Sequence, residues 1–356
     1  MKLIDKVKNL PSSPGVYLMK DSSDNVIYVG KAKNLKNRVR SYFQNTKAHS
    51  QKIKKLKANI NDFQLILTDT EFEAIMLECK LIKDIKPIFN KKMKNPTSYT
   101  YIRFQKRNTH WIVDISNTIE KDGSLYFGPY PSKQTVEKAL QGMKEFLKID
   151  CGNPNKGTPC LNYSLGLCIG ICFNEDSRKQ YNERLRKMMD FLHGTDTEVL
   201  QELKQKMIDA SNNFDFEKAA KYRDTLDAIQ SLIYKEKVID FTEANKNIAL
   251  IEYIEDATLK LFLIKGNLVL FSEKYKIKEE NSEQLVDKIK ANILKHFKSL
   301  SNLSSIEVSR DEIDEAQIIY SYLNSSSCKY VIIDEDWLEF EHQKNLDSSI
   351  INSLLN

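Results

Sequence analysis

The apolar and polar positions of the first 95 residues follow two different periods, one typical of strands and one typical of helices. Apolar runs bounded by turn residues predict strands, and apolar residues three to four apart predict amphipathic helices. In chain order, the pattern predicts a strand, a turn, a strand, two helices, a strand and a helix: Val16–Lys20, 21–25, Val26–Val29, a helix after Gly30, 50–59, Asp62–Thr68 and a helix ending near Lys86. We therefore expect a compact α/β domain over residues 1–95.

Two of these helices carry recognisable start signals. Asn34 stands where a helix cap is expected, directly before apolar residues spaced four apart. Thr70 and Glu73 have the spacing of a capping box, in which each side chain bonds the other residue's backbone N–H. Pro87 marks the end of the helix that the box opens, because the residue before a proline disfavours helical geometry.

The pattern after residue 95 predicts segments of several kinds. They are a linker extension over 96–150, a cysteine segment over 151–175, a helical region over 176–238 with a hairpin at about 199–234, and an α+β domain over 239–356. Within the extension we expect strands, a turn and a helix: Tyr99–Gln105, Trp111–Ile115, a turn at Phe127–Pro131 and a helix over Thr135–Leu147. The whole chain is thus predicted to be a multidomain α/β and α protein.

Composition places the chain among ordinary globular proteins, since 41% of its residues are hydrophobic and 29% are charged. Its 356 residues suit two to three domains. The chain contains no run of about 20 apolar residues, and its first six residues lack the apolar core of a signal peptide. We therefore expect a cytoplasmic protein with no membrane partner.

The net charge of +5 is distributed unevenly along the chain. Residues 1–94 carry +11, which leaves −6 for the remaining 262 residues. Ten Lys or Arg and no acid lie between Lys31 and Lys57, a density that suits contacts with nucleic-acid phosphates. A solvated helix face is the plain alternative. The residues that we expect to contact DNA are Lys33, Lys36, Arg40, Lys52, Lys54, Lys55 and Lys57.

Four of the six cysteines lie within 22 residues, at Cys151, Cys160, Cys168 and Cys172. In a chain interpreted as cytoplasmic, clustered thiols are more often metal ligands than disulfides. No two of the four are separated by two residues, so the spacing matches a zinc ribbon poorly and leaves the metal open.

One acidic residue lies within the apolar face of the last helix of the N-terminal domain. At about 100° per residue, Glu78 falls among leucine and isoleucine side chains, where a carboxylate is costly unless a cation meets it. A buried ion pair with Lys or Arg explains this position as well as a metal-binding or catalytic role does. Glu71 differs, because it lies in the first turn, where the helix dipole favours negative charge.

Tyrosines and cations are expected near this acid. Tyr17 and Tyr28 lie on the two predicted strands of the hairpin, and Arg38 and Tyr42 are four apart on the helix that follows. Each tyrosine alone would fit a small core equally well. Together with Lys31 and the helix acid, they suit phosphodiester chemistry. Because the domain offers few carboxylates, we expect one divalent ion rather than a two-metal site.

These motifs resemble the GIY-YIG nuclease domain of the UvrC family, the incision subunits of bacterial nucleotide excision repair. The similar segments of the N-terminal domain are Pro14–Tyr17, Tyr28–Ala32, Asn37–Phe43 and Leu77–Asn90. Further segments resemble the linker, the cysteine segment and the UvrB-binding helical hairpin (UVR) of that family: Gly128–Pro131, Cys160–Cys172 and Phe216–Asp224.

The resemblance implies a role for each residue of the site. Glu78 would hold the divalent metal, Mg²⁺ or Mn²⁺, and Arg38 would stabilise charge on the phosphate. Tyr17, near Lys31, would help to take the proton from the attacking water. The surroundings of the phosphate and metal would be completed by Tyr28, Tyr42 and Asn90, the last of which is indicated by the family alone.

The resemblance also implies a cofactor and partners. In this family the clustered cysteines bind a four-iron four-sulfur cluster, which fits ligation by thiolates alone, and zinc is the alternative. The hairpin would bind UvrB through Phe216, Ala220 and Arg223. Damaged double-stranded DNA would be the substrate.

The chain departs from the family in a few places. Lys80 stands where Asn is usual, and Ile171 where Pro is usual. Residues 248–333 resemble only the opening of the family's ribonuclease H-like domain, so we expect a partial domain over 239–356, in a fragment or a naturally short relative. The predicted function is an endonuclease that makes the incision 3′ to a lesion in UvrB-bound DNA. The alternative is a non-catalytic UvrB-binding adaptor.

Overall fold

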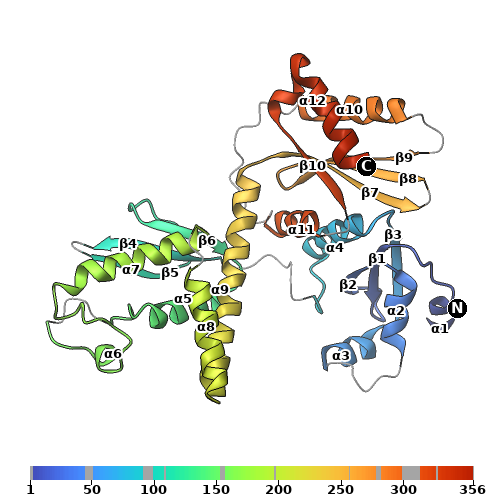
Figure 1. The fold of residues 1–356 in the computed structure, drawn as a ribbon. Coiled ribbons are helices and arrows are strands. Elements are labelled where there is room, and N and C mark those ends of the chain that lie inside the picture. Colours follow the sequence, from blue (N-terminus) through green and yellow to red (C-terminus); the bar gives the residue numbers. More distant parts are fainter. Residues whose placement is uncertain are drawn as a thin grey trace. The chain divides into compact units, whose positions relative to one another are not determined.

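The structure of the protein, a computed structural model, divides into two compact units (Figure 1). One unit consists of residues 1–95 and 241–356, and the other of residues 96–240. The structure describes residues 3–44, 51–90, 99–107, 110–152, 157–195, 198–255, 257–277, 282–298, 313–325 and 328–355.

The N-terminal part of the first unit is a small three-stranded sheet flanked by helices. Its elements are α1 (Leu3–Lys8), β1 (Gly15–Lys20), β2 (Val26–Ala32), α2 (Leu35–Phe43), α3 (Gln51–Asn59), β3 (Asp62–Leu67) and α4 (Glu71–Ile85). The strands are antiparallel in the order β2-β1-β3. Both predicted start signals are confirmed, since Asn34 caps α2 and Thr70 and Glu73 form the capping box of α4.

Both faces of the central strand β1 are buried. Successive side chains of a strand point to opposite sides of the sheet, so those of β1 enter two different cores. Val16 and Leu18 pack with Ala74 and Ile82 of α4. Tyr17 and Met19 point to the other side and join the core formed by α2 and α3. The sheet therefore lies between α4 on one face and α2 and α3 on the other.

The C-terminal part of this unit is a four-stranded sheet in the order β10-β7-β8-β9, in which every neighbouring pair is antiparallel. Its elements are β7 (Asn247–Glu255), β8 (Thr258–Lys265), β9 (Leu268–Lys276), α10 (Ser282–Lys298), α11 (Ile313–Leu323), β10 (Lys329–Ile333), two short 3₁₀ turns (Glu335–Leu338 and Phe340–His342), α12 (Gln343–Ser349) and a final π-helical turn (Ile350–Leu355). Helices α10 and α12 cover one face, and α11 and α4 cover the other (Figure 1). These strands and helices agree with the α+β content predicted for residues 239–356, and the ribonuclease H-like assignment stays a prediction.

The second unit combines another small sheet with long helices. Its elements are β4 (Thr100–Arg107), β5 (His110–Ser116), β6 (Leu125–Tyr130), α5 (Lys133–Phe146), α6 (Leu161–Ser164), α7 (Ser177–Leu192), α8 (Glu198–Asn212) and α9 (Phe216–Glu243), of which α9 runs past the unit's end at residue 240. The sheet order is β5-β4-β6. The predicted helical hairpin is confirmed as α8 and α9, although α9 is longer than expected.

One prediction for this unit is wrong. The turn expected at Phe127–Pro131 lies mostly within strand β6. Phe127 and Tyr130 are buried in the core of the unit, and that packing outweighs the local turn preference of Gly128 and Pro129. The glycine and proline lie where the register between β4 and β6 shifts, a position in a sheet that tolerates both residue types.

In the part of the chain that the structure describes, no helix is both long enough and apolar enough to cross a membrane.

Candidate active site

Three tyrosine rings lie together between the N-terminal sheet and α2. Tyr17 comes from β1, Tyr28 from β2 and Tyr42 from α2, and their ring centroids are 5.8 to 6.4 Å apart. The hydroxyl groups of Tyr17 and Tyr42 are 2.9 Å apart and share a hydrogen bond. Gly30 lies opposite Tyr17 in the sheet, and a Cβ at this glycine would overlap the Tyr17 hydroxyl. The backbone of β2 thus leaves room for the buried phenol because residue 30 has no side chain.

Arg38 joins this group from the exposed side of α2. Its Nε donates to the Tyr17 hydroxyl over 3.3 Å, and its guanidinium carbon lies 5.5 Å from the centre of the Tyr42 ring. Burial raises the pKa of Tyr17 well above its ordinary value, and burial also raises that of Tyr28. At neutral pH the site therefore presents protonated phenols beside a fixed positive charge.

Glu78 reaches the same region from α4. One carboxylate oxygen accepts a hydrogen bond from the backbone N–H of Lys31, over 3.1 Å. Among the described residues, no Lys or Arg nitrogen lies within 4.0 Å of this carboxylate, since the Lys31 ammonium instead pairs with Glu71 at 2.6 Å. Burial raises the pKa of Glu78, and the nearby charges of Lys31 and Arg38 oppose that shift. The ion-pair explanation of this buried acid therefore finds no partner in the described part of the chain.

The outer edge of β2 is covered by a row of contacts. The backbone N–H of Phe89 donates to Ile27, and the Asn90 side chain both accepts from and donates to the backbone of Val29, each over 2.9 Å. Glu78 continues the row at Lys31, two residues along the strand. Alternate residues of an edge strand point their peptide groups outward, and here each one finds a partner. Asn90 thus holds the strand that carries Tyr28 and does not itself point into the tyrosine cluster.

The residues present fit a divalent cation of the hard, oxygen-binding kind. Glu78 has one oxygen fixed by the Lys31 amide, and its other oxygen has no donor among the described residues. Carboxylate oxygen is the ligand that Mg²⁺ and Mn²⁺ prefer. Glu71 is already neutralised by Lys31 and Glu73 by Lys260, and Asp84 is exposed, so Glu78 is the half-buried acid of α4 that remains for such an ion among the described residues.

The basic residues predicted to bind DNA differ in their surroundings. Lys33, Lys52, Lys54 and Lys55 are exposed, whereas Lys36 and Lys57 are half-buried. Lys52 of α3 places its ammonium 5.6 Å from the centre of the Tyr28 ring, so the basic helix borders the tyrosine cluster. Arg40 is used within the fold, because its guanidinium donates to the carbonyls of Val7 and Lys8 at the end of α1.

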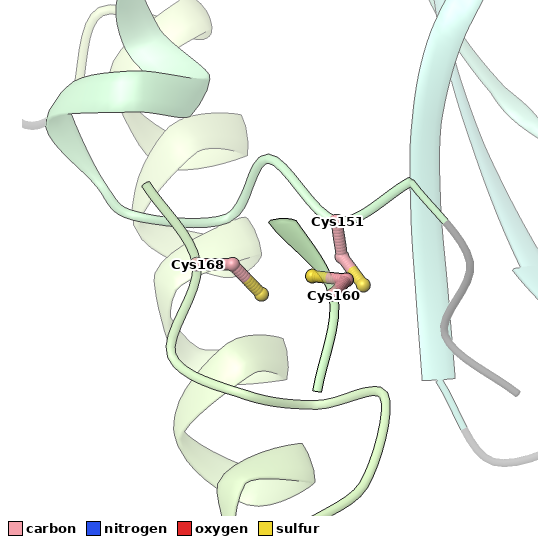
Figure 2. A group of neighbouring side chains, drawn as sticks. All are labelled: Cys151, Cys160 and Cys168. Carbon is pink, nitrogen blue, oxygen red and sulfur yellow. The ribbon is translucent and has the colours of Figure 1, made fainter. Parts of the chain in front are cut away.

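The clustered cysteines converge in space. The sulfur atoms of Cys151, Cys160 and Cys168 all lie within 4.8 Å of one another (Figure 2). Cys172 is buried and interacts with the thiol of Cys160. Burial opposes ionisation of Cys160, but the Tyr163 N–H and the neighbouring thiols outweigh it and lower the pKa. The four thiols predicted to act together are therefore neighbours.

The helical hairpin exposes part of its apolar surface. Phe216 is 63% exposed at the start of α9. Together with Ala220 and Arg223 it lines a surface groove whose other side is formed by α8, through Met207, Ile208, Ser211 and Asn212. Leu203 and Leu226 of the same hairpin are buried in the core of the unit.

Comparison with known proteins matches three sequence models along the chain. The UvrC-like GIY-YIG domain matches residues 13–91, the middle domain of UvrC/Cho excinucleases residues 99–191, and the UvrB/uvrC motif residues 197–232. The "UvrABC system protein C" of Clostridium tetani is 40% identical over 82% of this chain and 48% of its own length. That of Clostridioides difficile is 34% identical over 92% of this chain and 56% of its own length. The chain belongs to the UvrC family. It has the GIY-YIG fold in its N-terminal region and the UVR helical region beyond it.

The chain spans about half the length of the curated UvrC relatives that it matches. A solved structure is described as the GIY-YIG N-terminal endonuclease domain of UvrC from Thermotoga maritima, bound to its catalytic divalent cation, magnesium. This chain is 36% identical to it, and the match covers 25% of this chain and 97% of that domain, with a TM-score of 0.23.

The sequence reasoning missed several residues around this UvrC-like site. Gly30 makes room for Tyr17, Glu71 takes up the charge of Lys31, and Lys52 borders Tyr28. In the sequence, Gly30 is indicated only as part of the family motif at residues 28–31. Nothing in the sequence alone pairs Lys31 with Glu71 rather than with Glu78, because the two acids lie about two turns apart on the same side of one helix.

Proposed function

We propose that the N-terminal region is a metal-dependent endonuclease domain that makes the incision 3′ to a lesion in UvrB-bound damaged DNA. The observation that carries the proposal is Glu78, a half-buried carboxylate beside Arg38 and three tyrosines that has no ion-pair partner among the described residues. Membership of the UvrC family supports the same conclusion.

Some side chains of the site balance charge on the phosphodiester, and others orient the reacting groups. Arg38, fixed by Tyr17 and stacked near Tyr42, neutralises the charge that develops on the phosphate oxygens. The protonated hydroxyl of half-buried Tyr28 binds a phosphate oxygen and helps to orient the attacking water. Tyr17 is fully buried, so it acts through its hydrogen bonds, which hold Arg38 and Tyr42 beside the phosphate, and the proton of the attacking water leaves to solvent. A divalent cation held by Glu78 would supply Lewis-acid stabilisation of the leaving oxygen.

Replacing Glu78 tests the function directly. A lesion-bearing duplex labelled at one end is incubated with UvrB, Mg²⁺ and the full chain, and 3′-side nicks are counted. We expect Glu78→Gln to lower the nicking rate by about a thousandfold while DNA affinity stays near wild type, because the carboxylate serves the cation and not the DNA backbone.

Asp84→Asn is the matched control for this experiment, because it removes an exposed acid from the same helix. It should nick like the wild type. Nicking by Glu78→Gln within about tenfold of wild type would contradict the proposal. Wild-type protein that binds UvrB and never nicks would favour the adaptor.

For DNA binding we propose that the exposed lysines beside the tyrosines contact phosphates of both strands without reading sequence. Lys33, Lys52, Lys54 and Lys55 are the principal candidates, with smaller contributions from Lys36 and Lys57. Arg40 contributes least, since it is held by α1. The slope of log K against log salt counts these contacts, at about 0.9 for each phosphate neutralised.

The groove at Phe216 is proposed to bind a helical hairpin of UvrB. A large exposed aromatic side chain beside an apolar groove and an arginine has the composition of an interface anchor. Phe216→Ala should weaken UvrB binding by about tenfold or more, as measured by calorimetry. Ile119→Ala removes a side chain of similar exposure outside the groove and should have no effect. Equal affinities of both variants would assign the groove another role.

The four clustered cysteines are proposed to bind a four-iron four-sulfur cluster, with zinc as the alternative. Their convergence supports a single metal site with sulfur ligands only. Residues 239–356 are proposed to be part of a ribonuclease H-like domain. Three consecutive antiparallel strands followed by a helix support that assignment.

A further inference from the structure

Helix α4 packs against two different sheets with opposite faces. Its inner face lies on the N-terminal sheet, where Ala74 and Ile82 contact β1 and β2. The same face carries Glu78 to the backbone of Lys31. Its outer face belongs to another core, in which Phe72 and Cys79 pack with side chains of β7, β8 and α11: Ile248, Leu250, Phe262, Ile264, Ile318, Ile319, Tyr322 and Leu323. The helix that carries the candidate metal ligand is thus shared between residues 1–95 and the C-terminal sheet.

The start of α4 is bound by a lysine from the C-terminal sheet. Lys260 of β8 has a side chain only 8% exposed, and its ammonium binds both Asp69, at 2.6 Å, and Glu73. Glu73 is the residue whose carboxylate accepts from the backbone N–H groups of Asp69 and Thr70 in the capping box. Lys274 of β9 adds a second bond to Asp69, at 2.9 Å. One buried cation therefore fixes the two acids that define where the helix begins.

Other contacts also hold the outer face of α4 against the C-terminal sheet and α11. The Phe72 ring packs edge-on against Phe262, with centroids 5.1 Å apart, and lies 4.9 Å from the Tyr322 ring. Near the end of the helix, Lys83 pairs with Glu315 of α11. The outer face of α4 is thus held in its first turn, through Cys79 near its middle and through Lys83 near its end, so the helix cannot slide along the N-terminal sheet without breaking these contacts.

We propose that the C-terminal sheet positions the catalytic helix, and that Lys260 is the positioning residue through which it does so. The proposal rests on the nuclease function proposed for Glu78. Holding the capping box in place fixes the axial position of α4, and that position sets where Glu78 meets β2. Displacements of about 1 Å at a reacting group lower rates by as much as 100-fold. The sheet that lies outside the GIY-YIG region therefore takes part in shaping its site.

Lys265 offers a matched control on the same strand. It too is a buried lysine of β8, but its ammonium bonds Asn247 at 3.2 Å and lies 3.9 Å from a Glu335 oxygen, and no hydrogen bond or ion pair joins it to α4 among the described residues. Replacing either residue by methionine removes one buried charge and keeps the length of the side chain. Both variants should lower the melting temperature, because each leaves buried partners unpaired. Only Lys260→Met should change the site.

Two measurements on the full chain separate positioning from stability. In metal-free protein, amide hydrogen exchange at Lys31 reports whether Glu78 still accepts from that N–H, and Lys260→Met should speed it by about tenfold. In the nicking assay, Lys260→Met should lower kcat by about 10- to 100-fold with KM within about twofold. Lys265→Met should match the wild type in both. Lys260→Arg keeps a cation that can bind two carboxylates and should recover most of the loss.

Unchanged Lys31 exchange in folded Lys260→Met protein would overturn the proposal, and so would equal effects of the two methionine variants. If Lys260→Met does not fold, Lys274→Met removes the half-exposed partner of Asp69 and should give a smaller change in the same direction. Wild-type protein that does not nick would refute the nuclease function, while the exchange measurement would still decide whether the sheet holds Glu78 in place.

Discussion

The candidate active site and the cysteine cluster are built in opposite ways. In the active site each polar side chain is held by another protein group: Tyr17 by Tyr42 and Arg38, and Glu78 by the Lys31 amide. In the cysteine cluster the interaction partners of the sulfur atoms are chiefly the neighbouring thiols. The described part of that segment contains one four-residue helix and glycines with positive φ. The first site is thus organised by hydrogen bonds between protein groups, whereas the thiols of the second are gathered by packing within the core of their unit.

Breaking the second site should have the largest effect on stability. We expect protein purified without oxygen to be brown and to contain iron, and Cys160→Ala to lose both. Because binding free energy of such a site is folding free energy, the unfolding free energy should fall on the order of 5 kcal/mol. Urea titration and iron analysis measure the two effects.

Cys328→Ala is the control, since it removes a half-buried thiol that lies outside the cluster. It should keep the colour and most of the stability. Colourless wild-type protein with one zinc per chain would reject the iron cluster, and an unchanged unfolding free energy in Cys160→Ala would show that the segment holds itself without a metal.

A smaller effect is expected where the protein itself holds the site. Asn90→Ala leaves the N–H and C=O of Val29 without their side-chain partner, at a cost of about 1–3 kcal/mol for a buried group. Amide exchange at Val29 should quicken, and nicking should slow as β2 loosens beneath Tyr28.

Asn59→Ala serves for comparison, because the Asn59 side chain is exposed and bonds only a carbonyl of its own helix. It should change neither measurement. Asn90→Asp keeps the acceptor and loses the donor, so its changes in Val29 exchange and in nicking should be smaller than those of Asn90→Ala. Val29 exchange in Asn90→Ala equal to that of the wild type would mean that the edge is held by its other contacts.

The smallest expected effect is a shift in pH dependence. Burial raises the pKa of Glu78, so the ionised form that binds a cation is lost at a higher pH than for an ordinary glutamate. At Mg²⁺ concentrations well below saturation, where the rate reports the metal-free enzyme, nicking should therefore begin to fall on acidification at a higher pH than an ordinary glutamate would give. For stability the sign is the reverse: the raised pKa means that Glu78 favours folding at low pH, and this contribution is lost as the pH rises through the folded-state value. If the nicking rate falls only at or below the ordinary glutamate pKa, another group controls the rate.

Local sequence patterns predicted much of the N-terminal region because its elements begin with local signals. Asn34 and Thr70 act within their own helices, and the alternation of β1 follows directly from its residues. The contacts that complete the site are not local. Asn90 meets Val29 across 61 residues, and Lys260 meets Asp69 across 191 residues, which no period in the sequence encodes. The strand at Phe127 was missed for the same reason, since the core that buries it comes from distant helices.

The covered edge of β2 has a consequence for association between copies of the chain. An edge strand with unpaired peptide groups invites a strand of another molecule to add to the sheet and begin aggregation. Here Phe89 bonds the carbonyl of Ile27, Asn90 bonds both polar groups of Val29, and Glu78 bonds the N–H of Lys31. The side chain that is proposed to bind the cation therefore also helps to keep the small sheet from pairing with another copy of itself.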